Sequence, residues 1–83
     1  MKGAPVKKRR DSGNLIRELR NRLGLTQEKM AARLGVTFPT INRWENGRAK
    51  PSPLALKQIE GLLVDLGDNG QDLLAKYFPK EAV

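Results

Sequence analysis

The 83-residue sequence contains neither cysteine nor histidine. Without cysteine the chain can form no disulfide bond and offers no thiolate to a metal ion. Without histidine it can hold no Ser-His-Asp triad, no Cys-His pair and no histidine-ligated zinc. Its nine acidic residues stand among sixteen basic ones, and they suggest no acid–base pair. We therefore expect a protein that is not an enzyme and that uses no metal or cofactor.

Long apolar runs and aromatic residues are scarce as well. No apolar stretch approaches the ~20 residues that a membrane-spanning helix needs. The charged N-terminal stretch is not followed by the apolar segment of a secretory signal, so we expect the protein to stay in the cytoplasm. With only four aromatic residues, a surface that stacks the bases of single-stranded nucleic acid is poorly supported.

Positive charge, by contrast, is abundant and unevenly distributed. Residues 1–50 contain thirteen basic and four acidic residues, whereas residues 51–83 contain three and five. A surface charged only for solubility would not divide the chain in this way. The asymmetry indicates that the first part of the chain contacts a polyanion such as nucleic acid.

The pattern of apolar residues, caps and breaks predicts an all-α fold of five short helices. Residues 1–13 are poor in apolar residues and predict a flexible basic arm. Ser12 or Asn14 would cap the first helix, and Ser52 followed by Pro53 is a typical helix start. Apolar residues at helical spacing then extend each segment. The predicted helices cover residues 14–23, 27–34, 38–46, 53–66 and 71–78, in one domain of residues 14–78 that a tail of residues 79–83 follows.

The second and third predicted helices are joined by a very short turn. Thr26 can cap the start of one and Thr37 the start of the other, because each hydroxyl can accept an amide of the first turn. Gly35, directly after Leu34, supplies the left-handed conformation that ends the first of these helices. With so few residues between them, the two helices must cross steeply. This arrangement is a helix-turn-helix, in which the second helix can enter the major groove of DNA.

Several fixed spacings in this region match those of one known family. The sequence reads Leu-Thr-Gln-Glu at 25–28, alanine at 31, Leu-Gly-Val-Thr at 34–37, isoleucine at 41 and Trp-Glu-Asn-Gly at 44–47. With these residues the chain resembles, over roughly residues 15–66, the phage repressor/Cro-like (xenobiotic-response-element type) helix-turn-helix family of bacterial and phage regulators. The resemblance implies a compact, five-helix, repressor-like domain that binds double-stranded DNA.

The third predicted helix has two chemically different faces. At 100° per residue, Ile41, Trp44 and Glu45 fall on one side, the inner face of this helix. We expect Ile41 in the core and Trp44 half-buried beside it, rather than stacked on a base. The resemblance implies that the residues on the other side contact base edges, and these are Phe38, Pro39, Thr40, Asn42 and Arg43. Arginine can bind guanine, asparagine can bind adenine, and an apolar group can meet the thymine methyl. Polar residues are more usual in this family at the positions of Phe38 and Pro39, so no operator sequence is predicted. The alternative to a base contact by Phe38 is that its ring folds back on the protein as a hydrophobic staple.

The resemblance also implies contacts to the DNA backbone and one structural ion pair. The glutamine that matches Gln27 bonds a phosphate in the family, at the positive end of a helix dipole. The predicted phosphate contacts are Gln27, Asn46, Arg48 and Lys50, together with the arm residues Lys7, Lys8, Arg9 and Arg10. Simple solvated cations are the alternative for the charged members. Arg20 and Glu45 are expected to form an ion pair that holds the third helix to the first.

These observations favour a sequence-specific, double-stranded DNA-binding transcriptional regulator that acts as a repressor. Two alternatives stay open: an antitoxin that binds a toxin protein and represses its own operon, and a protein-interaction or co-activator module with non-specific nucleic-acid contact. Because one helix reads only a few base pairs, we expect a homodimer on a palindromic operator. Tyr77 and Phe78 are expected near its two-fold axis, unless they only cover the core.

Overall fold

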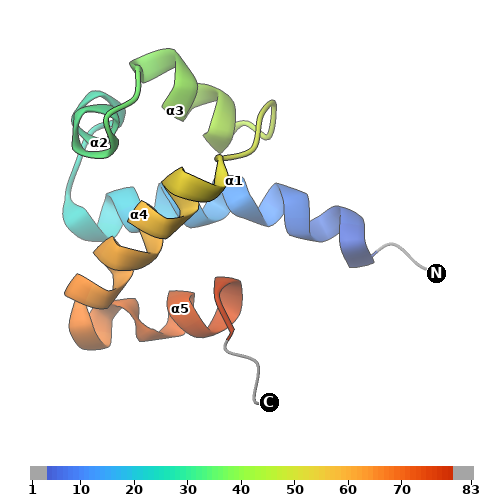
Figure 1. Ribbon diagram of the computed structural model, residues 1–83, viewed down its shortest axis with the longest axis vertical. Helices are drawn as coiled ribbons and strands as arrows, with labels where there is room; N and C mark the ends of the chain where they lie inside the picture. The colour runs from blue at the N-terminus through green and yellow to red at the C-terminus, as the bar shows by residue number, and fades with distance from the viewer. Residues whose placement is uncertain (1–3, 80–83) are drawn as a thin grey trace.

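The structure, a computed structural model, describes the backbone of residues 4–79 and the side chains of residues 12–79. This part of the chain is helical and contains no strand, which confirms the all-α class (Figure 1). None of the described helices is long and apolar enough to span a membrane. The helices are α1 (Ala4–Leu23), α2 (Gln27–Leu34), α3 (Phe38–Glu45), α4 (Pro53–Asp65) and α5 (Gln71–Tyr77), with a short 3₁₀ helix, η1 (Gly67–Gly70), before α5.

The helices are arranged around one core. In Figure 1, α2 and α3 form one end of the molecule and α5 the other, with α1 and α4 between them. Trp44 of α3 is only 5% exposed, so it packs in the core and offers no platform for base stacking. The buried apolar residues come from all five α-helices: Leu15, Ile16, Leu19, Met30, Ala31, Leu34, Ile41, Trp44, Ala55, Ile59, Leu63 and Leu73.

The first helix differs from the prediction. It begins at Ala4, so a start at Ser12 or Asn14 was wrong. Pro5 lies in the first turn, where a helix tolerates proline, and the lysines and arginines that follow are good helix formers. Gly13 lies inside this helix, and a Cβ there would lie 2.8 Å from the backbone oxygens of both Trp44 and Glu45. The end of α3 therefore packs directly on the backbone of α1, while a flexible arm of residues 1–13 stays a prediction.

The turn between α2 and α3 has the predicted caps. The Thr26 hydroxyl accepts the Lys29 amide at 3.1 Å at the start of α2. Gly35 has φ 72°, the left-handed conformation that ends this helix. The Thr37 hydroxyl then accepts the Thr40 amide at 3.4 Å at the start of α3. These local contacts set the angle at which α3 leaves α2.

The C-terminal helix α5 is anchored to α1. Arg22 donates to the two carboxylate oxygens of Asp72 at 2.6 and 3.0 Å, and to the carbonyl of Asn69 at 2.8 Å. Leu73 is buried, and three further apolar residues of this region pack partly buried against the core: Leu74, Tyr77 and Phe78. The helix therefore covers the core at this end, and a dimer contact through it stays a prediction.

Candidate nucleic-acid interface

The outward face of α3 is open to solvent. Phe38 is 45% exposed and lies outside the core cluster, so it does not fold back as a staple. Pro39 and Arg43 are exposed as well, and Thr40 and Asn42 are partly exposed. A surface hollow on this side is lined by Phe38, Pro39, Asn42, Arg43, Asn46 and Arg48. The structure thus gathers four of the five predicted base-contacting residues around one hollow.

The fifth of these residues, Thr40, is tied to the start of the helix. Its hydroxyl lies 2.9 Å from that of Thr37, which also accepts its backbone amide. Pro39 lies in the same first turn, where the amide that it lacks has no partner inside the helix. The unusual Phe38-Pro39 pair is therefore compatible with a regular α3 and changes only the chemistry of its exposed end.

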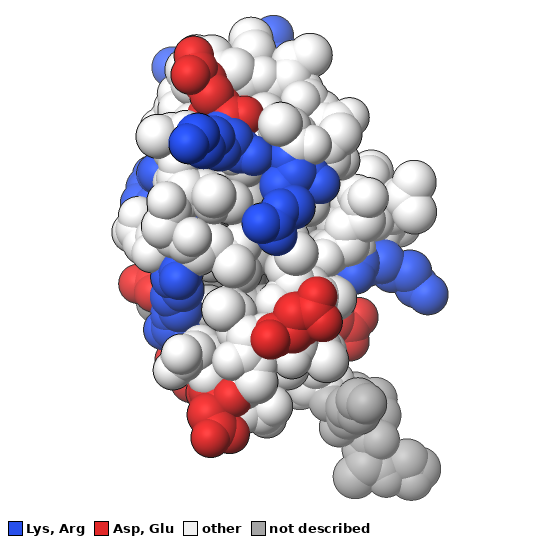
Figure 2. Space-filling model, turned by 90° about the vertical axis from the view of Figure 1, so that its left-hand side faces the viewer, with Lys and Arg blue, Asp and Glu red and all other residues white. Residues whose placement is uncertain are grey.

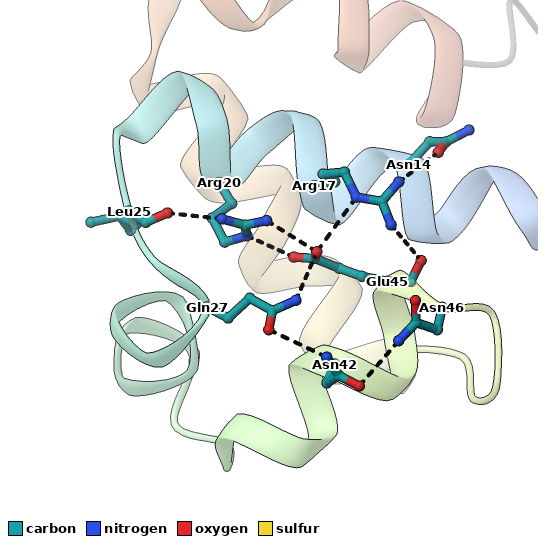
Figure 3. Close-up of polar contacts among 8 residues, drawn as sticks. All are labelled: Asn14, Arg17, Arg20, Leu25, Gln27, Asn42, Glu45 and Asn46. Carbon is teal, nitrogen blue, oxygen red and sulfur yellow. Dashed lines mark hydrogen bonds and ion pairs between the residues drawn. The ribbon is translucent and has the colours of Figure 1, made fainter.

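The carboxylate of Glu45 lies beneath this face and is held by α1. Its side chain is 2% exposed. The Nε of Arg20 donates to Oε2 at 2.7 Å, and Nη2 donates to Oε1 at 3.1 Å (Figure 3). The same guanidinium donates to the carbonyl of Leu25 at 3.2 Å. The structure thus brings Arg20 and Glu45 together in a bidentate pair that joins α1, α3 and the segment leading into α2.

A second arginine of α1, which the sequence analysis missed, also contacts Glu45. The Nη2 of Arg17 donates to the backbone carbonyl of Glu45 at 3.0 Å, and its Nε lies 3.6 Å from Oε1. The carbonyls in the last turn of a helix have no partner within it, so Arg17 satisfies one of them for α3. The available signal was its place three residues before Arg20, on the same side of a helix.

These contacts determine the ionisation of Glu45. Burial by itself raises the pKa of this carboxyl, but hydrogen bonds from Arg20 and Gln27 and the positive charges of Arg20 and Arg17 outweigh it. The pKa of Glu45 therefore lies below its ordinary value of 4.5. The hydrogen bond to Glu45 raises the pKa of Arg20, against a smaller effect of burial. Both groups are charged at neutral pH.

Three side-chain amides connect Glu45 to the surface between α2 and α3 (Figure 3). Gln27 donates from Nε2 to Oε1 of Glu45 at 2.9 Å. Asn42 donates from Nδ2 to Oε1 of Gln27 at 3.3 Å, and Asn46 donates from Nδ2 to Oδ1 of Asn42 at 3.1 Å. We call these three residues the amide chain. The sequence analysis assigned Asn42 to the bases and the other two to phosphates, and did not anticipate that they bind one another.

The cations near the end of α3 are available to a ligand. Arg43, Arg48 and Lys50 are exposed, and no carboxylate with a described side chain pairs with any of them. On the face drawn in Figure 2, Lys and Arg predominate in the upper half, over α2 and α3, and Asp and Glu in the lower half. The predicted contacts Lys7, Lys8, Arg9 and Arg10 lie outside the described side chains.

In this structure α2 and α3 are joined at a glycine turn, and the outward face of α3 is open with cations beside it. This arrangement defines the helix-turn-helix class of DNA-binding domains. The family model described as Helix-turn-helix matches residues 16–63. The chain therefore belongs to the Cro/C1-type helix-turn-helix family of DNA-binding transcriptional regulators, and the predicted resemblance is confirmed.

Curated relatives from archaea and bacteria share this region. A protein of Archaeoglobus fulgidus is 34% identical over 68 residues, which are 81% of this chain and 30% of the relative. One of Methanothermobacter thermautotrophicus is 53% identical over 45 residues, 54% of this chain and 65% of the relative. Both are named uncharacterized HTH-type transcriptional regulators. A propionyl-CoA carboxylase regulator of Cereibacter sphaeroides is 44% identical over 54 residues, 61% of this chain and 12% of the relative.

The chain thus spans less than two thirds of the length of each of these relatives. No solved structure matches it significantly.

Proposed function

We propose that this protein is a sequence-specific repressor that acts in the cytoplasm and reads the major groove of double-stranded DNA with α3. The observation that carries the proposal is the exposed face of α3, where Phe38, Pro39 and Arg43 surround one hollow. Two apolar groups gain nothing by facing water, but they can contact thymine methyl groups. Arg43, which pairs with no carboxylate among the described side chains, can bind guanine O6 and N7. Thr40 completes the base-reading set, whereas Asn42 has both polar atoms of its side chain engaged within the protein.

The DNA backbone is held on either side of α3 in this proposal. Gln27 lies at the N-terminus of α2, where the helix dipole favours an anion. Asn46, Arg48 and Lys50 contact the phosphates beyond the other end of α3, and the cations at positions 7–10 add further contacts. Such contacts fix the position of the domain without reading sequence. Each Lys or Arg among them, because it neutralises a phosphate, contributes roughly −0.9 to the slope of log affinity against log salt.

Two copies bind one palindromic operator in this proposal, because a single α3 reads too few base pairs for adequate specificity. The half-sites would lie about 34–36 Å apart. Tyr77 and Phe78 lie near the two-fold axis. A hollow at this end supports that choice: Val64, 57% exposed, and Phe78 line it together with Leu74, Pro79 and the polar residues Glu60 and Gln71.

Selection of binding sites from random duplex DNA tests the proposal. We expect one enriched sequence with inverted symmetry, bound by two protomers in sedimentation experiments. Arg43→Ala should lose about 1–3 kcal/mol on the selected site and relax the preference at one base pair. Failure to enrich any sequence would refute specific binding, and an enriched site without inverted symmetry would refute the dimer.

A further inference from the structure

The hydrogen bonds of the amide chain all run in one direction. Asn46 donates to Asn42, Asn42 donates to Gln27, and Gln27 donates to Glu45. An amide group can in principle take either orientation, because its oxygen accepts and its nitrogen donates. A carboxylate, by contrast, accepts only. The direction of the chain is therefore decided at the end where it meets Glu45.

The buried carboxylate fixes each amide in turn. Because Glu45 is held by the Arg20 guanidinium and is 2% exposed, it can neither donate nor turn away. Gln27 must direct its nitrogen toward Glu45, which turns its oxygen toward Asn42. Asn42 must then donate to that oxygen, which leaves its own oxygen for the Asn46 nitrogen. One charge beneath the surface thus orients three neutral side chains above it.

This orientation leaves hydrogen-bond donors at the surface. Each amide nitrogen carries two N–H groups, and the contacts between described residues use one of each. Gln27 and Asn42 are partly exposed and Asn46 is exposed, so their second N–H groups can meet a ligand. Phosphate oxygens accept hydrogen bonds and do not donate, so a row of donors suits the DNA backbone.

We propose that Glu45 orients the amide chain so that the seam between α2 and α3 presents N–H donors to the DNA phosphates, and that Asn42 binds this backbone and reads no base. The inference rests on the proposed function, since it concerns the same DNA complex. It makes Glu45 a positioning residue that acts on DNA through Gln27. It also assigns Asn42, which the sequence analysis placed among the base-contacting residues, to the backbone contacts.

Binding of Asn42→Ala to two duplexes tests the role of Asn42. One duplex carries the site selected by the wild-type protein and the other a scrambled sequence, both at low salt. We expect Asn42→Ala to weaken both by a similar factor, roughly tenfold, because a donor to a charged oxygen is lost. Asn42→Asp should weaken both further, because it places a carboxylate against the phosphates. Asn21→Ala, an exposed asparagine beside α5, is the matched control and should bind as the wild type does.

Selective loss on the selected site, with changed preference at one base pair, would show that Asn42 reads a base and would overturn the inference. Unchanged binding of both duplexes by Asn42→Ala would overturn it as well. These results differ from a failure of the proposed function, in which the wild-type protein itself would not distinguish the two duplexes.

A double-mutant cycle tests the role of Glu45. Glu45→Gln replaces the carboxylate by an amide that can donate or accept, so the hydrogen bonds of the amide chain lose their fixed direction. We expect weaker binding of both duplexes with the same ratio between them, measured at a temperature at which circular dichroism shows each variant folded. In a Gln27→Ala background the same change should cost less than about twofold further, because its effect passes through Gln27. If Glu45→Gln weakened DNA binding by the same factor with and without Gln27, the positioning role would be overturned.

Discussion

The substitution Glu45→Ala removes the carboxylate on which α1, α2 and α3 converge. Glu45 accepts hydrogen bonds from Arg20 and Gln27 and lies beside the guanidinium of Arg17. Without this carboxylate, the one hydrogen bond that the Arg20 side chain keeps to the described residues is the bond to the carbonyl of Leu25. Because that side chain is only 18% exposed, the substitution leaves a largely buried positive charge without a counter-ion.

The expected cost can be worked out from this burial. Removing one partner of a buried ion pair costs roughly 3–5 kcal/mol. Since Arg20 keeps some contact with water, we expect a loss near the lower limit, about 3 kcal/mol. A domain of this length has a free energy of unfolding of about 4–12 kcal/mol at ~0.05–0.15 kcal/mol per residue. The melting temperature should therefore fall by about 12–24 °C, at roughly 4–8 °C for each kcal/mol.

Thermal unfolding at neutral pH without DNA, followed by circular dichroism, measures this loss. Glu18→Ala is the matched control, because Glu18 is 52% exposed and pairs with Arg22 on the surface of α1. Exposed pairs of this kind contribute little, so the control should change stability by less than about 1 kcal/mol. If Glu45→Ala melted within about 3 °C of the control, less than 1 kcal/mol would separate them, and the argument from a buried pair would be refuted.

Three further predictions concern packing, pH and salt. Gly13→Ala should destabilise the domain by about 1–3 kcal/mol in urea unfolding although alanine is the better helix former, because its Cβ would meet two backbone oxygens at 2.8 Å; a stabilised variant would show that α1 and α3 lie further apart. The pKa of Glu45 is lowered in the folded state, so its charge contributes stability above about pH 4.5 that is lost as the pH falls below this value. The difference in melting temperature between wild type and Glu45→Gln should accordingly shrink on acidification, and a constant difference would contradict the linkage. Lys50→Ala should weaken binding to selected and random duplexes alike and reduce the magnitude of the salt slope by about 0.9. Lys57→Ala on α4, the control, should leave the affinity and the slope unchanged. An unaltered slope for Lys50→Ala would rule out its phosphate contact.

Local sequence signals were enough to predict the helices of the helix-turn-helix and the inward face of α3. Thr26, Gly35 and Thr37 act on amides and dihedral angles within a few residues of themselves, so their effect does not depend on the rest of the fold. The helical spacing likewise placed Ile41 in the core and Trp44 on the same inward side, where the structure buries it more fully than expected. Local signals of this kind were sufficient for the fold class and for the two ends of α2.

The features that depend on contacts between distant segments could not be predicted from such local signals. The sequence analysis placed Gly13 at the end of an arm, yet it lies within α1, where the end of α3 leaves no room for a side chain. Arg17 contacts a residue 28 positions later, and Arg22 meets Asp72, 50 positions away. The direction of the amide chain depends on the buried charge of Glu45, which α1 holds in place. The periodicity of apolar residues and the helix caps do not predict which side chains of different helices meet, because those contacts are determined by how the helices pack.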